Sequence, residues 1–357
     1  ASVATRANSC RSNEIYRNRP PCSLPVKLRV GIVRLFAPYL RMLTPVLFLL
    51  LGLVLLFFGG EGLVRGSAAL ARRLGLTPLV VGLTVVAFGT SAPELVVSVQ
   101  AALAGQGDIA IGNVLGSNSL NIGLILGLTA LIYPLKVQLQ ILSIDMPIMV
   151  GASLLAAWML ADRTISRPEG ALLFAGILAY TVFTVLYATK VRPSVEVEAE
   201  FAEAVPKPTG SLWRDLLFIA AGLALLVAGS HFLVEGAVRL ARGFGISEAI
   251  IGLTIVALGT SMPELVTCLV AAWKKESDIA LGNIIGSNIF NLFGILGAAA
   301  LARPITGEGI KMLDLCVAIA FAATLLPILW SGRKMQRWEG GLLLAGYITY
   351  VVYLWPK

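Results

Sequence analysis

Two glutamates lie inside long apolar stretches, and each ends the same short string, Gly-Thr-Ser-x-Pro-Glu. The string ends at Glu94 in the first half of the chain and at Glu264 in the second. A carboxylate at membrane depth is costly unless it is paired or faces a wet cavity. The Gly and Pro of the string interrupt a helix, and the carbonyls freed at such a break are tolerated only where they line a cavity. The pair therefore indicates a buried polar site. The hydroxyl oxygens beside the two glutamates belong to Thr90, Ser91, Thr260 and Ser261.

A capping box is the alternative interpretation of this string. Ser91 would be the N-cap of a helix and Glu94 would fold back from position N3, and Ser261 and Glu264 would do the same. A cap surrounded by lipid would not require a full charge. The two copies in apolar surroundings therefore favour a site with charge of its own, with capping as a possible addition.

A second repeated string, Gly-Asn-x-x-Gly-Ser-Asn-x-x-Asn, covers residues 112–121 and 282–291. It places a hydroxyl and an amide four residues apart, on one helix face. These side chains are Ser117 and Asn121, and Ser287 and Asn291. Calcium binds six to eight oxygens with carboxylate support. The candidate set contains no Cys or His, which argues against zinc or copper.

Both strings belong to one internal duplication. Residues 82–131 and 252–301 align without a gap at an offset of 170, and 28 of the 50 positions are identical. A site made of duplicated residues is expected to contain matched pairs.

Composition places the duplication in a membrane. The 357 residues are 57% hydrophobic and 13% charged, whereas soluble domains are about a quarter charged. Uncharged stretches are long enough to span a bilayer, and with the shorter ones they predict about ten spans. The longest cover residues 42–60, 74–93, 109–135, 171–189, 216–234, 279–302 and 315–332. The fold class expected is an all-α polytopic membrane protein.

The predicted organisation has four parts. Residues 1–43 form a basic tail that carries most of the net charge of +8, so this charge does not indicate a nucleic-acid partner. We expect the tail to be non-native or removed. Residues 44–188 and 213–357 form two five-helix repeats, and 189–212 is an acidic linker loop. Because five is odd, the second repeat must enter the membrane from the opposite side, so the repeats are inverted.

The two duplicated strings closely resemble the alpha repeats of the calcium/cation antiporter superfamily, which includes the sodium/calcium exchangers and their prokaryotic relatives. The resemblance covers nearly all of residues 42–357 and implies ten helices and alternating access. It also implies an ion site around Glu94 and Glu264, with the hydroxyl and amide residues named above as neighbours. Backbone oxygens of Ala87 and Ala257 would contribute by the same comparison. Many exchangers carry Asp where this chain has Asn291, which leaves the counter-ion open.

The expected function is therefore exchange of calcium for sodium at a midplane site, with no cofactor, by a protein that is not an enzyme. A proton-coupled antiporter of calcium or another divalent cation is the alternative. We expect a multi-pass protein of the cell membrane, the inner membrane in a bacterium, that acts as a monomer with the lipid bilayer around it. A channel and an intramembrane protease are less compatible with the inverted duplication and with the absence of a base for a serine nucleophile.

Several other polar residues receive structural interpretations. Asp145 and Asp314 precede apolar stretches and are expected to begin helices, and Asp108 and Asp278 resemble N-terminal caps. The four cysteines have no paired spacing and are expected to be free thiols. They are Cys10, Cys22, Cys268 and Cys316.

Overall fold

The computed structural model describes residues 26–190, 211–244 and 257–354. The predicted tail up to residue 25 and residues 191–210 of the predicted linker lie outside the described part. The chain divides into two units, Ala1–Thr44 and Pro45–Lys357. Helix α1 (Val26–Leu74) begins in the first unit, within the predicted tail. All packing described below lies within the second unit.

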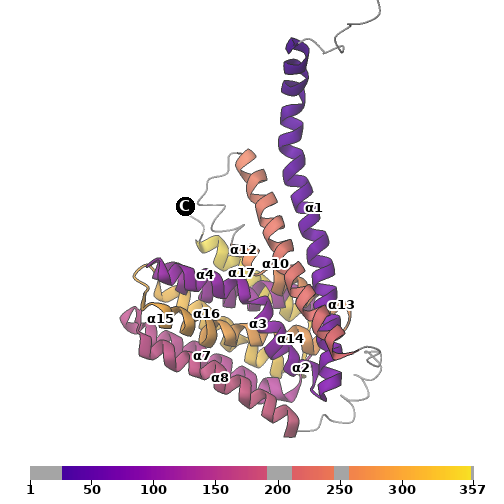
Figure 1. Cartoon of the computed structure of the whole chain (residues 1–357). Coiled ribbons are helices and arrows are strands. Elements are labelled where there is room, and N and C mark those ends of the chain that lie inside the picture. The colour runs from indigo at the N-terminus through magenta and orange to yellow at the C-terminus, as the bar shows by residue number, and fades with distance from the viewer. Residues whose placement is uncertain (1–25, 191–210, 245–256, 355–357) are drawn as a thin grey trace, which may run out of the picture. The chain divides into compact units, whose positions relative to one another are not determined.

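Helical segments make up most of both repeats (Figure 1). After α1, the first repeat contains α2 (Pro78–Val81), η1 (Gly82–Val86), α3 (Ala87–Thr90), α4 (Ala92–Leu103), α5 (Gly107–Leu120), η2 (Asn121–Leu126), α6 (Gly127–Ile132), η3 (Ile141–Asp145), α7 (Met146–Met159), η4 (Leu160–Asp162) and α8 (Arg167–Lys190). The second contains α10 (Leu212–Gly243), α12 (Ala257–Thr260), α13 (Met262–Trp273), α14 (Ser277–Ile289), η6 (Phe290–Ile295), α15 (Leu296–Ala302), α16 (Met312–Trp330) and α17 (Arg337–Leu354).

Corresponding elements recur at the offset of the sequence duplication. Helices α4 and α13 begin and end exactly 170 residues apart, and α8 and α17 begin 170 residues apart. Two short strands follow each other in each repeat, β1 (Leu135–Lys136) and β2 (Thr164–Ile165), then β3 (Ile305–Thr306) and β4 (Lys334–Met335). Strand β1 pairs antiparallel with β4, and β2 with β3. The repeats are therefore joined reciprocally.

Seven described helical stretches are long and apolar enough to cross a membrane. They cover Leu43–Leu74, Gly107–Ile132, Ile141–Asp162, Arg167–Ala188, Leu212–Arg242, Ser277–Ala302 and Met312–Trp330. The bent pair Pro78–Thr90 and Ala92–Leu103 would make an eighth span. The helical, multi-pass expectation is confirmed, with four two-residue strands as the only described β-structure.

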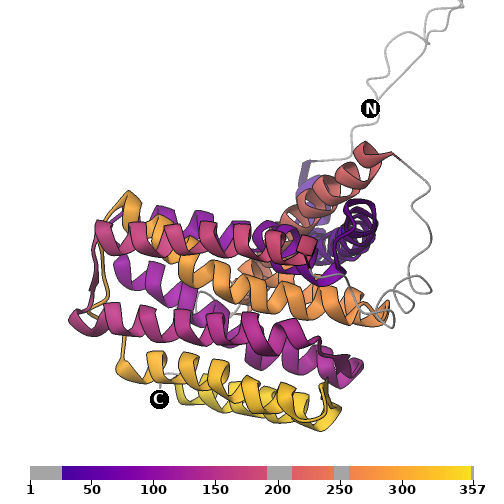
Figure 2. The ribbon, with the colours of Figure 1, turned by 90° about the horizontal axis from the view of Figure 1, so that it is seen from below.

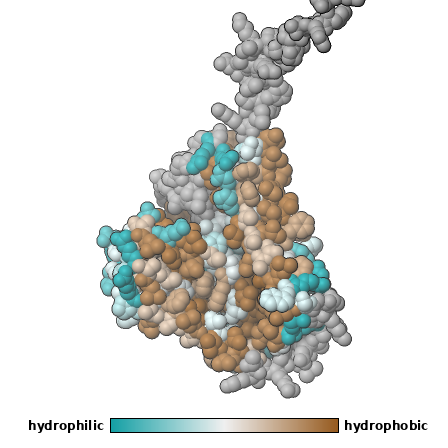
Figure 3. All heavy atoms as spheres, viewed as in Figure 1, coloured by the Kyte–Doolittle hydropathy of each residue, from teal (hydrophilic) through white to brown (hydrophobic). Residues whose placement is uncertain are grey.

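Helices α7, α8, α15 and α16 lie side by side in Figure 1, and Figure 2 shows the same helices from a second direction. Helix α8 packs along α15, and α17 packs along α6, so each repeat covers the other. In Figure 3, apolar residues dominate the visible face of the described helices, and hydrophilic residues gather in patches. This surface suits contact with lipid.

Glycines allow α1 and α10 to approach closely. A Cβ added at Gly222 would lie 2.6 Å from the backbone nitrogen of Leu63, and one added at Gly52 would lie 2.7 Å from that of Leu233. Gly222 is the duplicate of Gly52 and Leu233 that of Leu63. The crossing is therefore formed twice by equivalent residues, as small residues do at membrane helix interfaces.

The expected role of Asp145 is wrong. It lies fully buried at the end of η3, within the span Ile141–Asp162, and makes no side-chain cap bond to α7. The Tyr180 hydroxyl donates to Asp145 Oδ1 over 2.9 Å. The prediction placed the start of the helix after the aspartate, where the uncharged stretch begins, whereas the helical span already begins at Ile141. Asp314, by contrast, caps α16 by accepting from the Lys311 backbone N–H, as expected.

Asp108 and Asp278 lie in the first turns of α5 and α14, but Gln106 and Glu276 hold the N-cap positions. The Asp108 carboxylate accepts from the backbone N–H of Gly309 instead. Of the cysteines, Cys268 and Cys316 are free thiols, as predicted, and the other two lie outside the described residues.

Candidate functional site

The two glutamates occupy the first turns of two half-helices. Glu94 lies in α4 and Glu264 in α13, and each is 1% exposed. Ser91 and Ser261 stand at the breaks before these helices with nearly identical backbone angles, φ −83° and ψ 8° against φ −91° and ψ 11°. Before α4 the axis bends by 48°. A helix N-terminus stabilises a nearby carboxylate through its dipole, which suits both positions.

The serine side chains reach across to the other repeat. Ser91 Oγ donates to Glu264 Oε1 over 2.7 Å, and Ser261 Oγ donates to Glu94 Oε1 over 2.9 Å. Neither serine makes a side-chain cap bond in its own helix. The capping-box alternative is therefore wrong for these side chains. Each glutamate is held by the repeat to which it does not belong.

Other oxygens gather around Ser91. Its Oγ lies 3.0 Å from Ser287 Oγ, which lies 3.4 Å from the Ala87 carbonyl oxygen. The Thr90 hydroxyl lies 3.3 Å from the same carbonyl and 3.0 Å from Asn283 Oδ1. Helix α3 thus supplies the Ala87 carbonyl and the Thr90 hydroxyl, and α14 supplies the Ser287 hydroxyl, close to the residue that holds Glu264.

Four of the buried side-chain oxygens that lack a hydrogen-bond partner in the described structure belong to residues of the two repeated strings. They are Oε2 of Glu94 and Glu264 and Oδ1 of Asn121 and Asn291. The glutamates are equivalent in the duplication, and so are the asparagines. Buried acceptors without a donor are costly, and oxygens are the ligands that hard cations prefer. These four oxygens therefore fit the ligands of a cation.

An asparagine network, which the sequence prediction did not include, joins the two second motifs. Asn121 Nδ2 donates to Asn288 Oδ1 over 3.1 Å, and Asn291 Nδ2 donates to Asn118 Oδ1 over 2.9 Å. Asn118 and Asn288 are themselves duplicates of each other. Both lie inside the repeated string, so their repetition was the sequence signal that could have identified them.

A further repeated amide supports the helix that carries each glutamate. Asn113 Nδ2 donates to the Glu94 carbonyl over 3.2 Å and to Ser98 Oγ over 2.9 Å. In the second repeat, Asn283 Nδ2 contacts Cys268 Sγ over 3.3 Å at the equivalent place. These amides fix α5 against α4 and α14 against α13.

Three further predicted residues are described by their positions along the helices. Ser117 is buried one turn before Asn121 in α5, and Thr260 is the half-buried last residue of α12. Ala257 begins α12, and its side chain lies outside the described part. Of the twelve predicted residues, direct contacts join Ala87, Thr90, Ser91, Ser287 and Glu264, and separately Ser261 and Glu94.

The family model described as sodium/calcium exchanger protein matches residues 44–186 and 215–355. The chain belongs to the sodium/calcium exchanger family. CaxA of Alkalimonas amylolytica is 40% identical over 294 residues, which cover 80% of this chain and 90% of CaxA. The sodium/calcium exchanger MaX1 of Methanosarcina acetivorans is 33% identical over 315 residues, covering 79% of this chain and 90% of MaX1.

Solved structures of the exchanger NCX_Mj have the same fold. One, soaked with zero Na⁺ and Ca²⁺, superposes with a TM-score of 0.77 at 32% identity and covers 88% of this chain and 100% of its own. As a member of the exchanger family, this chain is a multi-pass membrane antiporter of cations and not an enzyme. The resemblance inferred from the duplicated strings is confirmed.

Proposed function

We propose that this exchanger family member carries calcium in exchange for sodium by alternating access. Its ions would bind near the bilayer midplane, between two inverted repeats of five helices each. The protein would work as a monomer in the cell membrane without a cofactor. The residues proposed to bind ions are Glu94, Glu264, Thr90, Ser91, Ser117, Asn121, Thr260, Ser261, Ser287 and Asn291, with the backbone oxygens of Ala87 and Ala257.

One observation carries this proposal. Of the buried oxygens without a hydrogen-bond partner in the described residues, four form two repeat-related pairs, on Glu94 with Glu264 and on Asn121 with Asn291. Two carboxylates supply the charge that a divalent cation needs, and neutral oxygens complete a shell of six to eight. Serine hydroxyls already donate to the other carboxylate oxygens, so one oxygen of each carboxylate is left for the ion.

The repeats also supply the movement. Inverted repeats place a site where their broken helices meet, and the two halves can rock around it to open on either side. The reciprocal serine bonds mean that each glutamate depends on both repeats. A displacement of one repeat relative to the other would therefore change both carboxylates together.

Proton coupling is the second candidate, and one residue favours it. The position that is Asp in many exchangers is Asn291 here, so the site carries one acidic group fewer. Fewer charges weaken the case for binding several sodium ions at once. The two carboxylates would then exchange calcium for protons.

Calcium uptake into proteoliposomes distinguishes the two candidates. Vesicles loaded with sodium and placed in sodium-free buffer at equal pH should accumulate ⁴⁵Ca²⁺, whereas vesicles with only an imposed pH gradient should not. The membrane potential is clamped in both. Protein-free vesicles and vesicles with the Glu94→Gln, Glu264→Gln double variant provide the background. Uptake that follows the pH gradient alone would support proton coupling, and downhill flux without a counter-ion would indicate a channel.

A further inference from the structure

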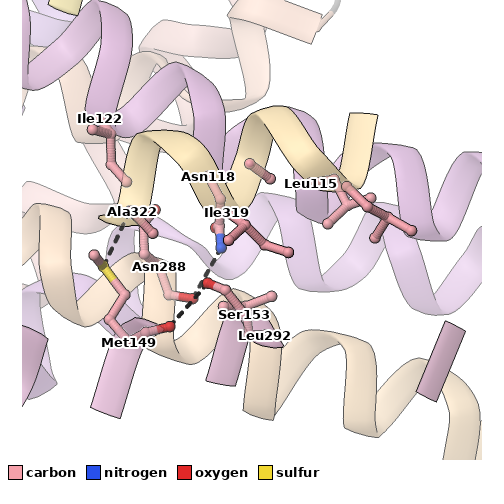
Figure 4. Close-up of a pocket in the computed structure, with 11 residues that line it drawn as sticks. Leu115, Asn118, Ile122, Met149, Ser153, Asn288, Leu292, Ile319 and Ala322 are labelled. Carbon is pink, nitrogen blue, oxygen red and sulfur yellow. Dashed lines mark hydrogen bonds between the residues drawn. The ribbon is translucent and has the colours of Figure 1, made fainter. Parts of the chain in front are cut away.

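Asn118 and Asn288 lie between the two repeats but outside the set of residues proposed to bind ions. Both are almost fully buried, at 5% and 1% exposure. They line a pocket between α5, α7, α14 and α16 together with Met149 and Ser153 (Figure 4). None of the twelve proposed ion-binding residues lines this pocket. Any role of Asn118 and Asn288 at the ion site must therefore act through the amide side chains that they contact.

Each of these asparagines accepts a hydrogen bond from an amide of the opposite repeat. Asn118 Oδ1 accepts from Asn291 Nδ2 over 2.9 Å, and Asn288 Oδ1 accepts from Asn121 Nδ2 over 3.1 Å. An amide whose nitrogen is bound in this way has a fixed orientation, with its oxygen on the other side. Those two oxygens, Oδ1 of Asn121 and of Asn291, are among the buried oxygens without a hydrogen-bond partner.

The two accepting amides are oriented in turn. Asn118 Nδ2 donates to the Asn288 backbone carbonyl over 3.2 Å. Asn288 Nδ2 contacts the Met149 sulfur over 3.6 Å, which is a weaker acceptor than a carbonyl. Figure 4 shows both contacts as dashed lines within the pocket. The orientation of Asn118 is therefore fixed more firmly than that of Asn288.

We propose that Asn118 and Asn288 are positioning residues of the ion site: each holds the amide of the opposite repeat's Asn291 or Asn121 so that its oxygen is presented to the transported cation. This inference rests on the proposed function. Asn118 acts through Asn291, and Asn288 acts through Asn121. The stronger effect is expected at Asn118, because its own amide is held by a carbonyl.

The first test compares calcium affinity with stability in purified protein. Apparent affinity is read from the rise of the melting temperature with added Ca²⁺. Removing a group that orients a metal ligand typically lowers affinity by about 10–100-fold, so Asn118→Ala should weaken calcium binding by about tenfold and Asn288→Ala by somewhat less. Ser153→Ala is the matched control. It removes a buried hydroxyl from the same pocket, one that donates to the Met149 carbonyl of its own helix, and affinity should stay within about twofold.

A double-variant cycle separates positioning from general packing. Asn291→Ser removes the amide nitrogen that donates to Asn118 but keeps an oxygen at the site. In that background Asn118→Ala should have no further effect on calcium affinity, because its partner is gone. In the Asn121→Ser background, Asn118→Ala should still cost its full factor, because these two side chains share no hydrogen bond among the described contacts.

The outcomes are distinct. If the unsubstituted protein shows no calcium-dependent stabilisation, the proposed function fails. If it does, but Asn118→Ala lowers only the melting temperature without calcium and leaves the affinity unchanged, the residue is structural and the inference fails. Equal effects of Asn118→Ala in both serine backgrounds would also overturn it.

Discussion

At the scale of single residues, Glu94 and Glu264 differ from Glu339, a buried glutamate in the first turn of α17. Glu339 is 3% exposed and accepts the backbone N–H of Gln336 over 2.7 Å and the Ser331 hydroxyl over 3.1 Å. It is a capping acid whose hydrogen bonds are local. Glu94 and Glu264 are instead held by serines of the opposite repeat and keep one oxygen without a donor. The same residue type therefore serves two purposes in one fold.

This contrast predicts how the three glutamates respond to loss of charge. Glu94→Gln and Glu264→Gln should each abolish calcium transport, because each carboxylate supplies charge that the other cannot replace. Glutamine keeps the size of the side chain and an oxygen that can accept the serine hydroxyl, so the bundle should stay folded. Glu339→Gln should leave transport within about twofold of the unsubstituted rate, since glutamine is accepted at a capping position.

The measurement is ⁴⁵Ca²⁺ uptake into proteoliposomes, with elution volume and melting temperature in detergent as controls of folding. Robust calcium exchange by the Glu94→Gln, Glu264→Gln double variant would exclude both carboxylates from the ion site.

At the scale of elements, the crossing of α1 with α10 depends on the absence of side chains at its glycines. A Cβ at Gly222 would approach the Leu63 nitrogen to 2.6 Å and the Gly59 carbonyl oxygen to 2.9 Å, and both neighbours are backbone atoms that belong to a helix. At Gly62, the nearest atom to an added Cβ is the Phe218 carbonyl oxygen at 3.5 Å, which is ordinary contact. The two glycines lie on the same crossing but differ in the space around them.

Gly222→Ala should therefore force the two helices apart and destabilise the protein by about 1–3 kcal/mol, the usual cost of overpacking. Gly62→Ala should change stability by no more than about 0.5 kcal/mol. Unfolding in detergent, followed by circular dichroism, measures both. Equal stability of the two variants would mean that the helices do not pack at this distance.

The sequence predicted these elements well where composition and repetition were informative. The half-helices that start beside Glu94 and Glu264 follow from a Pro and Gly string within apolar surroundings, and the duplication predicted that they would match. The sequence did not reveal which groups would accept hydrogen bonds from the serine hydroxyls. Ser91 fits a capping pattern in the sequence of its own helix, and only the placement of the second repeat shows that its hydroxyl donates to Glu264.

The network of Asn118 and Asn288 was missed for a similar reason. Helical spacing of four residues predicts which side chains share a face, but the bonds of these asparagines run between repeats. The helix also changes to a π-helical turn at Asn121 and again around Asn291, and such turns often occur at functional sites. Asp145 was misassigned because a charged residue was taken as the boundary of a span, whereas it lies buried within the span and accepts a hydrogen bond from the Tyr180 hydroxyl.

At the scale of the whole molecule, neither repeat can complete the site alone. Both serine bonds to Glu94 and Glu264, and both hydrogen bonds that the amide nitrogens of Asn121 and Asn291 donate, cross between repeats. A chain divided between residues 200 and 201, within the predicted linker, should therefore transport calcium when both fragments are co-expressed and should not when either is expressed alone. Co-purification of the fragments and ⁴⁵Ca²⁺ uptake measure the two parts of this expectation. Transport by the fragment of residues 1–200 alone would contradict a shared site.

The strand pairs β1–β4 and β2–β3 have the same reciprocal form as an isologous interface, in which residue i contacts j and j contacts i. Such an interface needs only one kind of subunit. A single half inserted in both orientations could have formed it with its own copy before duplication joined the two. After fusion each half became free to diverge, and duplicate positions with different residue types record that freedom. Asn113 bonds the Ser98 hydroxyl, whereas its duplicate Asn283 bonds the sulfur of Cys268, the duplicate of Ser98, so the two halves keep the same contact with different chemistry.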